Sequence, residues 1–375
     1  MKDTDVLIVG AGPTGLTLAA SLLTRGVDAV VVDQLPSGAN TSRAAVVNAR
    51  SLELLEDLDV SRRLVKAGLA APRFTMRQGA AVLISVDFSE LPTRYPYSLM
   101  ISQADTEQAL EERLNELGGK VIRPKTLCRL EQDVSGVTAT FDDGDSMRAA
   151  YVVGADGMHS TVRNQAEIGF AGGEFAESFT LADVHITGDA PPDEVILFYG
   201  NEGLTVLAPL PGDIHRIVAP AAQAPQVPTT RFVQDLLDSR GFGPGRSLVT
   251  KLVWGSRFRI QHRVADTYRL GRLLLAGDAA HVHSPAGGQG MNLGITDAVA
   301  LAGALCEGSD TALDSYSATQ RARAQQVLRL TGRLTTVSTM PRPLRPVRNA
   351  AMRLAAHIPA VQREFAWRLS GLVNR

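Results

Sequence analysis

Residues 4–15 read TDVLIVGAGPTG: a short apolar strand, then G-x-G-x-x-G, with apolar residues at helical spacing from Pro13 to Arg25. The first glycine of such a turn permits a tight reversal, the second lets the backbone approach a pyrophosphate, and the third lets helix and strand pack closely. The positive end of the helix then faces the anion. The turn therefore predicts dinucleotide binding. Its candidate binding residues are Gly10, Gly12, Pro13, Thr14 and Gly15.

The second strand of this unit is predicted over 29–33 and ends in a carboxylate. Asp33 lies 23 residues beyond Gly10, near the spacing of about 20 at which an acid binds a ribose hydroxyl, and Gln34 follows it. Leu16 stands where a P-loop requires lysine, so a P-loop is excluded. The motif alone leaves NAD and FAD both open.

Two later segments have the same strand-to-acid pattern. Residues 152–163 read VVGADGMHSTVR and place Asp156 and Gly157 in a sharp turn after a strand. Residues 271–281 read GRLLLAGDAAH and place Gly277 and Asp278 at the end of a buried strand. Ligands of open α/β sheets bind at these carboxyl ends. Singly, each acid is typical of a helix cap in a turn, but together and in this order the three segments favour a cofactor site.

Asp278 is followed by a glycine-rich stretch, PAGGQGMN, over 285–292 and then by a predicted helix. Backbone N–H groups and the positive end of a helix suit a ring that becomes anionic. A reduced flavin is such a ring, and Asp278 would accept hydrogen bonds from its ribityl hydroxyls. The candidate residues of this stretch are Pro285, Gly287, Gly288, Gly290, Met291 and Asn292.

The composition is that of a globular protein: 375 residues, 45% hydrophobic and 21% charged, with net charge −1. This balance predicts no nucleic-acid partner. No apolar run approaches the roughly 18 residues that a membrane span needs. The first residues do not resemble a secretory signal, and the two cysteines make no disulfide framework. We therefore expect a soluble, cytoplasmic protein.

With these three segments the chain resembles the class A flavoprotein aromatic hydroxylases, typified by para-hydroxybenzoate hydroxylase. The segments match the G-x-G-x-x-G, DG and GD motifs of that family, and the resemblance covers essentially the whole chain. It implies that Asp156 supports both FAD and pyridine-nucleotide handling and that Asp278 holds the ribityl chain. Asp33 departs from the many members that carry Glu, although the shorter acid still reaches a ribose. Further FAD contacts implied by the resemblance are Arg43, Ala44, Gln103 and Leu127.

The resemblance implies an FAD-dependent monooxygenase that uses NADPH or NADH. Reduced flavin in this family binds O₂ as a C4a-hydroperoxide, whose distal oxygen passes to an electron-rich substrate, here a phenol or an aromatic polyketide. Because the cofactor carries most of this chemistry, the protein supplies orientation, dryness and dipoles. No catalytic residue is assigned. The oligomeric state leaves no mark in the sequence.

The fold class predicted is α/β: a Rossmann-like FAD-binding domain with an inserted β-sheet substrate domain and C-terminal helices. Short strands broken by Gly and Pro between Phe170 and Trp254 indicate the insert. We expect a discontinuous FAD-binding domain over 1–72, 101–169 and 265–340, a substrate domain over 73–100 and 170–264, and a helical segment over 341–375. Helices are expected over 50–58, 105–117, 290–306 and 312–330.

Two other functions stay open. The first is an FAD-dependent reductase or dehydrogenase of the same superfamily, which transfers no oxygen. The second is a non-catalytic binder of the GDP-dissociation-inhibitor type, against which the intact acids argue. A flavin halogenase is less well supported, because Trp254 and Trp367 are the only tryptophans and form no Trp-x-Trp motif.

Two features remain outside these motifs. His281 and His283 suggest a metal, but without a third ligand at suitable spacing we expect packing or a flavin contact. Residues 342–375 hold seven arginines and one acid. This segment suits an acidic membrane surface, but we expect a helix pair that covers one domain face with the apolar stripe Leu344, Val347, Ala351 and Leu354.

Overall fold

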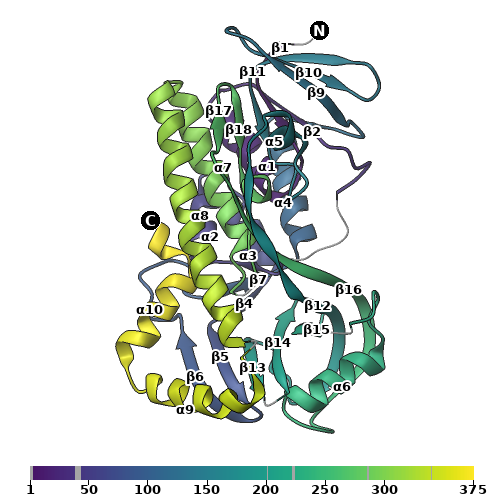
Figure 1. Cartoon of the computed structure of the whole chain (residues 1–375), viewed down its shortest axis with the longest axis vertical. Coiled ribbons are helices and arrows are strands. Elements are labelled where there is room, and N and C mark those ends of the chain that lie inside the picture. Colours follow the sequence, from purple (N-terminus) through teal and green to yellow (C-terminus); the bar gives the residue numbers. More distant parts are fainter. Residues whose placement is uncertain (1–2, 39–43, 201, 222–223, 285–286, 339) are drawn as a thin grey trace.

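Two large sheets lie at opposite ends of the molecule, and long helices run alongside (Figure 1). The computed structural model describes residues 3–38, 44–200, 202–221, 224–284, 287–338 and 340–375. The sheet that contains the first strand is mainly parallel, and the second sheet is mainly antiparallel. The α/β class predicted from the sequence is therefore confirmed.

The first sheet has a parallel core. Its strands are β1 (Asp3–Val9), β2 (Ala29–Val32), β8 (Val121–Ile122), β9 (Leu127–Gln132), β10 (Val137–Phe141), β11 (Ser146–Gly154), β17 (Arg269–Leu270) and β18 (Leu273–Leu275). The parallel strands lie in the order β8-β2-β1-β11-β18. Strand β2, the next strand in the chain, therefore pairs with one side of β1, and β11, much later in the chain, pairs with the other. Strands β17, β10 and β9 add antiparallel pairs.

The helices described by the structure cover both sheets. They are α1 (Pro13–Thr24), α2 (Ala49–Glu56), α3 (Ser61–Ala67), α4 (Gln103–Glu116), α5 (Thr161–Gln165), α6 (Thr230–Arg240), α7 (Gly290–Glu307), α8 (Asp310–Ser338), α9 (Arg345–Ala355) and α10 (Pro359–Leu369). Short 3-10 turns lie at η1 (Gly277–Ala279), η2 (Arg342–Leu344) and η3 (Leu372–Asn374). No helix in the described ranges is both long and apolar enough to cross a membrane.

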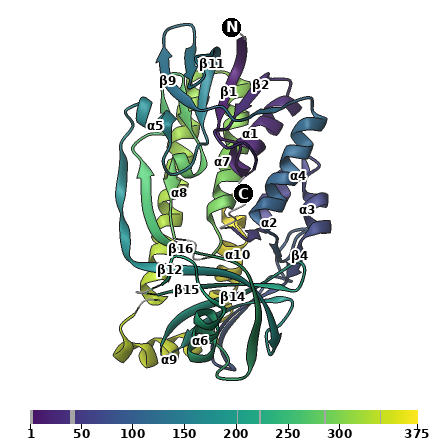
Figure 2. The same ribbon diagram turned by 90° about the vertical axis from the view of Figure 1, so that its right-hand side faces the viewer.

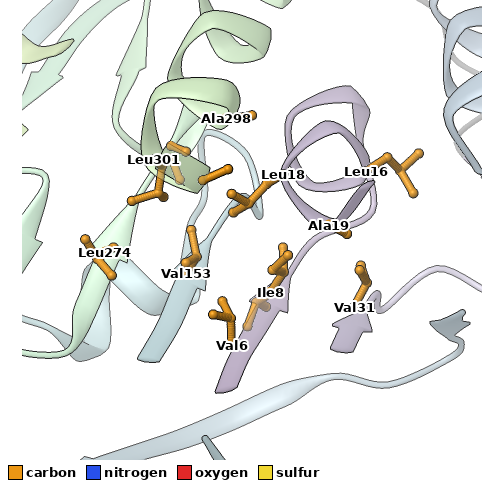
Figure 3. Close-up of a cluster of buried hydrophobic side chains, with 14 of the residues drawn as sticks. Val6, Ile8, Leu16, Leu18, Ala19, Val31, Val153, Leu274, Ala298 and Leu301 are labelled. Carbon is orange, nitrogen blue, oxygen red and sulfur yellow. The ribbon is translucent and has the colours of Figure 1, made fainter. Parts of the chain in front are cut away.

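The parallel strands are apolar because helices bury them. Figure 3 shows Ile8 of β1 beneath Leu18 of α1, with Val153 of β11 and Leu301 of α7 beside them. All four side chains are fully buried. Continuous apolar runs such as VLIV in β1 are typical of parallel strands, which lose contact with water on both faces. This packing fixes the carboxyl ends of the strands relative to α1 and α7.

The second sheet contains the two longest strands of the fold, and most of its strands come from other parts of the sequence, residues 73–87 and 170–265. Its strands are β5 (Arg73–Gln78), β6 (Ala81–Asp87), β12 (Phe170–Gly188), β13 (Glu194–Gly200), β14 (Gly203–Leu210), β15 (Ile214–Pro220), β16 (Ser247–Ala265) and β19 (His281–Val282). They lie in the order β19-β16-β12-β15-β14-β13-β5-β6, antiparallel except for the β13–β5 pair. Figure 2 shows this sheet beneath the parallel one, with β12 and β16 continuing upward between them. A small third sheet, β3 (Val46–Val47), β7 (Ser98–Met100) and β4 (Leu69–Ala71), completes the fold.

Several elements differ from the sequence-based prediction. Strand β16 was not predicted, because arginine and glutamine alternate along its half-exposed length and reduce its apolar signal. Helix α6 was also missed. Helix α4 begins two residues before the predicted start, because the hydroxyl of Ser102 caps it by accepting from the Asp105 amide. Helix α8 extends beyond the predicted range 312–330 at both ends.

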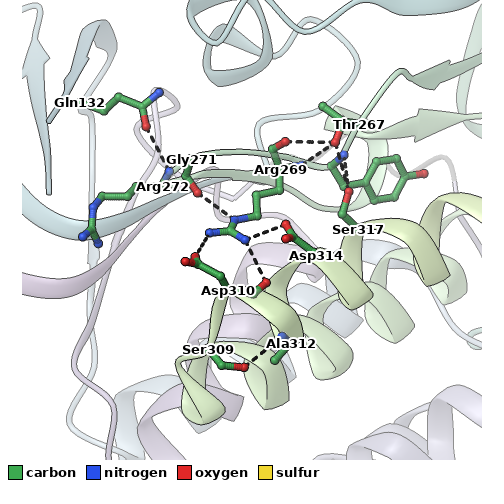
Figure 4. Close-up of polar contacts among 11 residues, drawn as sticks. Gln132, Thr267, Arg269, Gly271, Arg272, Ser309, Asp310, Ala312, Asp314 and Ser317 are labelled. Atoms are coloured by element: carbon green, nitrogen blue, oxygen red, sulfur yellow. Dashed lines mark hydrogen bonds and ion pairs between the residues drawn. The ribbon is translucent and has the colours of Figure 1, made fainter. Parts of the chain in front are cut away.

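A charged cluster fastens α8 to the edge of the first sheet (Figure 4). The Arg269 guanidinium donates to the carboxylates of Asp310 and Asp314, the latter at 2.7 Å, and to the Gly271 carbonyl at 2.9 Å. Tyr268 donates its amide to the Ser317 hydroxyl at 3.0 Å. The start of α8 is thereby held next to β17 and β18.

The expected packing of the C-terminal stripe is wrong. Leu344, Val347 and Leu354 are 51%, 67% and 71% exposed, whereas Arg348 and Asn349 on the opposite side of α9 are buried. The helix does pack near β6, but through its polar side and Met352. Hydrogen bonds from Arg348 and Asn349 to the Tyr199 carbonyl, and not the apolar stripe, set the rotation of α9 about its axis.

The third glycine of the first turn offers a test of this packing. A Cβ at Gly15 would lie 1.9 Å from the Gly10 carbonyl oxygen, whereas a Cβ at Gly12 would meet no atom within 4 Å. We expect Gly15→Ala to lower the free energy of unfolding by roughly 1–3 kcal/mol, as overpacking does. Gly12→Ala, the matched control, should change it by less. Urea unfolding of both variants measures this difference, and equal stabilities would contradict the packing.

Candidate cofactor site

Four turns meet at one edge of the parallel sheet. Gly10 follows β1, Asp33 follows β2, Asp156 lies two residues after β11, and Gly277 lies two residues after β18. Because the four strands are neighbours and parallel, their carboxyl ends share this edge. The chain also changes direction of winding at β1, which is where open α/β sheets bind ligands.

The glycine turn leaves room where a pyrophosphate would lie. Gly10 has φ +106°, and a Cβ there would lie 2.3 Å from the Ala155 carbonyl, so this position tolerates no side chain. Gly12 is the N-cap of α1 and precedes Pro13 in the first turn, and a Cβ at Gly12 would meet no atom within 4 Å. The unpaired N–H groups of the first helical turn suit an anion there. The turn therefore fits a dinucleotide.

Asp33 stabilises the glycine turn through a hydrogen bond and keeps capacity to bind a ligand. Its Oδ2 accepts from the Ala11 amide at 2.7 Å, and its Oδ1 accepts from the Leu35 amide at 2.8 Å. A carboxylate offers about four lone-pair sites, so acceptor capacity remains for a ribose hydroxyl. Gln34, beside it, is exposed.

Asp156 caps the following helix, as the simpler interpretation of the motif suggested. Its Oδ2 accepts from the Thr161 and Val162 amides at 2.7 and 3.2 Å. Its Oδ1 is buried and has no hydrogen-bond partner among the described residues. Burial raises the pKa of this carboxyl above its usual value. Gly157 next to it has φ +77°, which a glycine adopts without strain.

The Gly277–Asp278 turn packs closely against the Thr14 side chain of α1. A Cβ at Gly277 would lie 2.5 Å from Thr14 Oγ1, and one at Gly294 in α7 would lie 2.3 Å from the same atom. Thr14, a residue of the first motif, therefore packs directly against the last motif and against α7. Asp278 is exposed at this edge.

The glycine-rich stretch before α7 is tied to β3 by one side chain. Asn292 donates its Nδ2 to the carbonyls of Val46 and Gly288 at 2.9 and 2.7 Å, and its Oδ1 accepts from the Asn48 amide at 2.9 Å. Gly287 and Gly288 both have positive φ, of +84° and +64°. Asn292 thus shapes the loop, with Gly290 at the start of α7.

The remaining predicted residues lie at varied places. Gln103 donates its side chain to Glu107 at 2.8 Å and its amide to the Ala44 carbonyl at 3.2 Å. Leu127 is buried in the core under the first sheet. Met291 is half-buried against the same core. Arg43 and Pro285 lie outside the described residues.

A buried ion pair beneath Asp278 was not predicted. His281 Nε2 and Asp297 Oδ2 are 2.6 Å apart, both side chains are fully buried, and the same Oδ2 accepts from the Gly277 amide at 3.0 Å. Burial alone lowers the pKa of His281, but the negative charge of Asp297, with a smaller effect from Asp278, raises it above its usual value. A lone acid within the apolar run 293–305 is the sequence signal for such a pair, because a buried charge needs a partner.

His283 differs from its neighbour. Its ring stacks on His281, its Nδ1 lies 2.9 Å from the Ser284 carbonyl, and burial lowers its pKa to about 4. Among the described residues no group of three potential metal ligands comes together. In the structure His281 pairs with Asp297, and His283 packs its ring against that of His281.

The pair predicts a pH dependence of stability. The raised pKa of His281 means that its stabilising charge is fully present below the unfolded value of about 6.5 and is lost as pH rises through the folded value. We expect Asp297→Asn to cost roughly 3–5 kcal/mol, because it leaves a buried group unpaired. It should also remove that loss of stability as the pH rises. Urea unfolding of the apoproteins across pH measures both, and an identical pH profile in the variant would contradict the pairing.

Comparison with known proteins identifies the family. Residues 3–331 match the family model of the FAD binding domain. The chain is 35% identical over 389 residues to YhjG of Bacillus subtilis, described as an uncharacterized aromatic compound monooxygenase, across 99% of this chain and 76% of the relative. It is 34% identical to the 12-dehydrotetracycline 5-monooxygenase/anhydrotetracycline 6-monooxygenase of Streptomyces rimosus, across 98% and 76%. The chain spans as little as 58% of another curated relative.

The fold is also that of solved structures. The structure of p-nitrophenol 4-monooxygenase PnpA from Pseudomonas putida superposes with a TM-score of 0.86 at 25% identity, covering 98% of both chains. The resemblance inferred from the three motifs is thereby confirmed, and the monooxygenase interpretation is favoured over the reductase and the non-catalytic binder. The chain belongs to the family of FAD-dependent aromatic monooxygenases, and its cofactor is FAD.

Proposed function

We propose that this protein hydroxylates a phenolic or polyketide aromatic compound with O₂ and NADPH or NADH. One oxygen atom enters the substrate and the other leaves as water, with the two electrons supplied by NAD(P)H. The observation that carries the proposal is the meeting of the glycine turn, Asp156 and Asp278 at one sheet edge, in a chain related to aromatic monooxygenases throughout its length.

The residues at this edge are proposed to hold FAD in a defined order. The Gly10–Gly15 turn and the N-terminus of α1 would bind the pyrophosphate. Asp33 and Gln34 would contact the adenosine ribose, and Asp278 the ribityl chain. The 287–292 loop would lie against the isoalloxazine, with Arg43, Ala44 and Gln103 along the cofactor. The open space at Gly12 supports the position proposed for the pyrophosphate.

The chemistry that FAD supplies when bound is electron transfer from NAD(P)H and activation of O₂. The chain's own contribution is positional. The positive end of the 18-residue helix α7 would stabilise negative charge near Gly290. Asn292 fixes the loop in front of it through three hydrogen bonds. Because the protein assists such reactions by orienting the reactants and excluding water, no general base is assigned.

The second sheet is proposed to hold the substrate. This domain would comprise 73–100 and 170–264. Helices α9 and α10 of the 341–375 segment pack near β6, whereas the last residues of the segment contact α2, where Arg375 pairs with Glu53. Arg216 of β15 supports the coupling of the two parts: it binds Asp183 through two hydrogen bonds of 2.7 and 2.8 Å and donates to the Ala44 carbonyl at 3.1 Å. Ala44 is followed by β3, to which Asn292 is tied. We also propose a cytoplasmic location, which suits the two free cysteines, Cys128 and Cys306.

The proposed function is tested by following both electrons and oxygen. Purified protein supplied with FAD is screened with phenols and polycyclic aromatic compounds for stimulated NADPH and NADH oxidation, and products are analysed after reaction under ¹⁸O₂. We expect a product that carries one ¹⁸O atom. NAD(P)H oxidation that delivers electrons to artificial acceptors, with no labelled product from any aromatic compound, would indicate a reductase instead.

Gly12 gives a direct test of the pyrophosphate site. Gly12→Val would fill the open space with a branched side chain, so we expect the purified variant to retain no FAD after gel filtration. Its apoprotein should fold, with stability within about 1 kcal/mol of the parent, as for substitutions at a helix cap. A folded variant that keeps stoichiometric FAD would contradict the assignment.

Asp278 tests the ribityl contact. A charge-assisted hydrogen bond contributes roughly 1.5–3 kcal/mol, so Asp278→Ala should weaken FAD binding by about one to two orders of magnitude. If Asp278 only stabilises its own turn, the apoprotein should instead lose about 1 kcal/mol of stability. Titration of the apoprotein with FAD and urea unfolding of the same variant separate these roles. Unchanged affinity with a destabilised apoprotein would exclude the contact.

A further inference from the structure

Helix α9 presents an apolar stripe to solvent. Leu344, Val347, Leu354 and Ile358 are 51%, 67%, 71% and 50% exposed, and Ala351 between them is exposed too. The spacing of Val347, Ala351 and Leu354 places them on one side of α9, and Leu344 and Ile358 flank the helix just before its start and just after its end. Single exposed aliphatic side chains are ordinary on protein surfaces, but an aligned row marks an interaction site.

The orientation of the stripe is fixed by polar contacts on the other side of the helix. Arg348 and Asn349 are 5% and 3% exposed, and both donate to the Tyr199 carbonyl, at 3.1 and 3.2 Å. The Arg348 guanidinium also lies 4.8 Å from the centre of the Tyr199 ring. Turning the stripe inward would break these contacts and leave a guanidinium without its partners. The polar contacts therefore fix the apolar stripe on the solvent-facing side of α9.

The surroundings of the stripe are cationic. Residues 342–375 contain seven arginines and one acid. Arg342 and Arg368 form ion pairs with Glu202 and Glu364. Arg353 and Arg363 are exposed, and within the described part of the chain neither forms an ion pair. Figure 1 places α9 at the end of the molecule farthest from the first sheet, where a flat surface has free access.

We propose that α9 rests on an anionic lipid surface, with its apolar stripe in the boundary between headgroups and acyl chains and Arg353 and Arg363 near the lipid phosphates. An apolar row on a helix with arginine around it is typical of interfacial helices. The contact is peripheral and reversible, and it is independent of the reaction proposed above.

A second copy of the chain fits this surface less well. Stable interfaces use about 20–30 residues a side, far more than this stripe offers. Two such segments would also bring like charges together, since each presents the exposed Arg353 and Arg363, which form no ion pair within the described part of the chain. An anionic surface satisfies both the apolar row and the charge.

The test is flotation of the FAD-loaded protein with vesicles of pure phosphatidylcholine and of phosphatidylcholine mixed equally with phosphatidylglycerol. We expect binding to the mixed vesicles only, weakening as salt is raised. Val347→Gln with Leu354→Gln should weaken it at least about tenfold, because two aliphatic side chains no longer leave water. Arg353→Glu with Arg363→Glu should weaken it by about fivefold or more for each arginine.

A matched control separates this surface from general stickiness. Leu248 in β16 is 57% exposed, so Leu248→Gln removes a comparable apolar side chain elsewhere and should leave binding unchanged. All variants should keep the parent's FAD content, since the positions are exposed. Absence of binding to the mixed vesicles, or equal binding by the Val347/Leu354 variant, would overturn the proposal. A dimer seen by light scattering that only the Val347/Leu354 variant abolishes would overturn it in favour of a second copy.

Discussion

The site depends on close contacts at three glycines, where a Cβ atom would not fit. Gly10 approaches the Ala155 carbonyl, Gly15 approaches the Gly10 carbonyl, and Gly277 approaches Thr14, each more closely than a Cβ permits. These contacts let β1, β11 and β18 end at the same edge, with α1 starting directly above them. The apolar packing of α1 and α7 against the strands then holds the edge in place. Without this close approach the three acids of the motifs would not share a site.

Several polar residues at the edge serve the fold and are placed for the cofactor at the same time. Asp33 holds the Ala11 amide, Asp156 caps α5, and Asn292 bridges β3 to the loop before α7. Asp297 holds the Gly277 amide from below with the charge of His281 beside it. A site organised before the cofactor arrives loses little conformational entropy on binding. In this account Asp278 is the exposed acid that the other contacts position.

The sequence allowed the parallel sheet and its turns to be predicted because local signals and the fold agree there. The apolar run of β1, the three glycines and the acids at strand ends all act within a few residues. Strand β16 was not predicted, because its alternating polar residues face solvent. The pairing of Asp297 with His281 was not predicted, because the two residues lie 16 positions apart in the sequence. The prediction that the apolar stripe of α9 is buried was wrong for a physical reason. The contacts of Arg348 and Asn349 with Tyr199, which is distant in sequence, decide which side of the helix is buried.

The central claim is that four turns, distant in sequence, form one FAD site. Hydrogen exchange of the backbone amides, followed by mass spectrometry with and without bound FAD, tests it most directly. The account predicts that FAD slows exchange at once in the 10–15, 33–38, 155–161 and 277–292 segments. Protection confined to the 10–15 turn, with exchange after β11 and β18 unchanged, would contradict it.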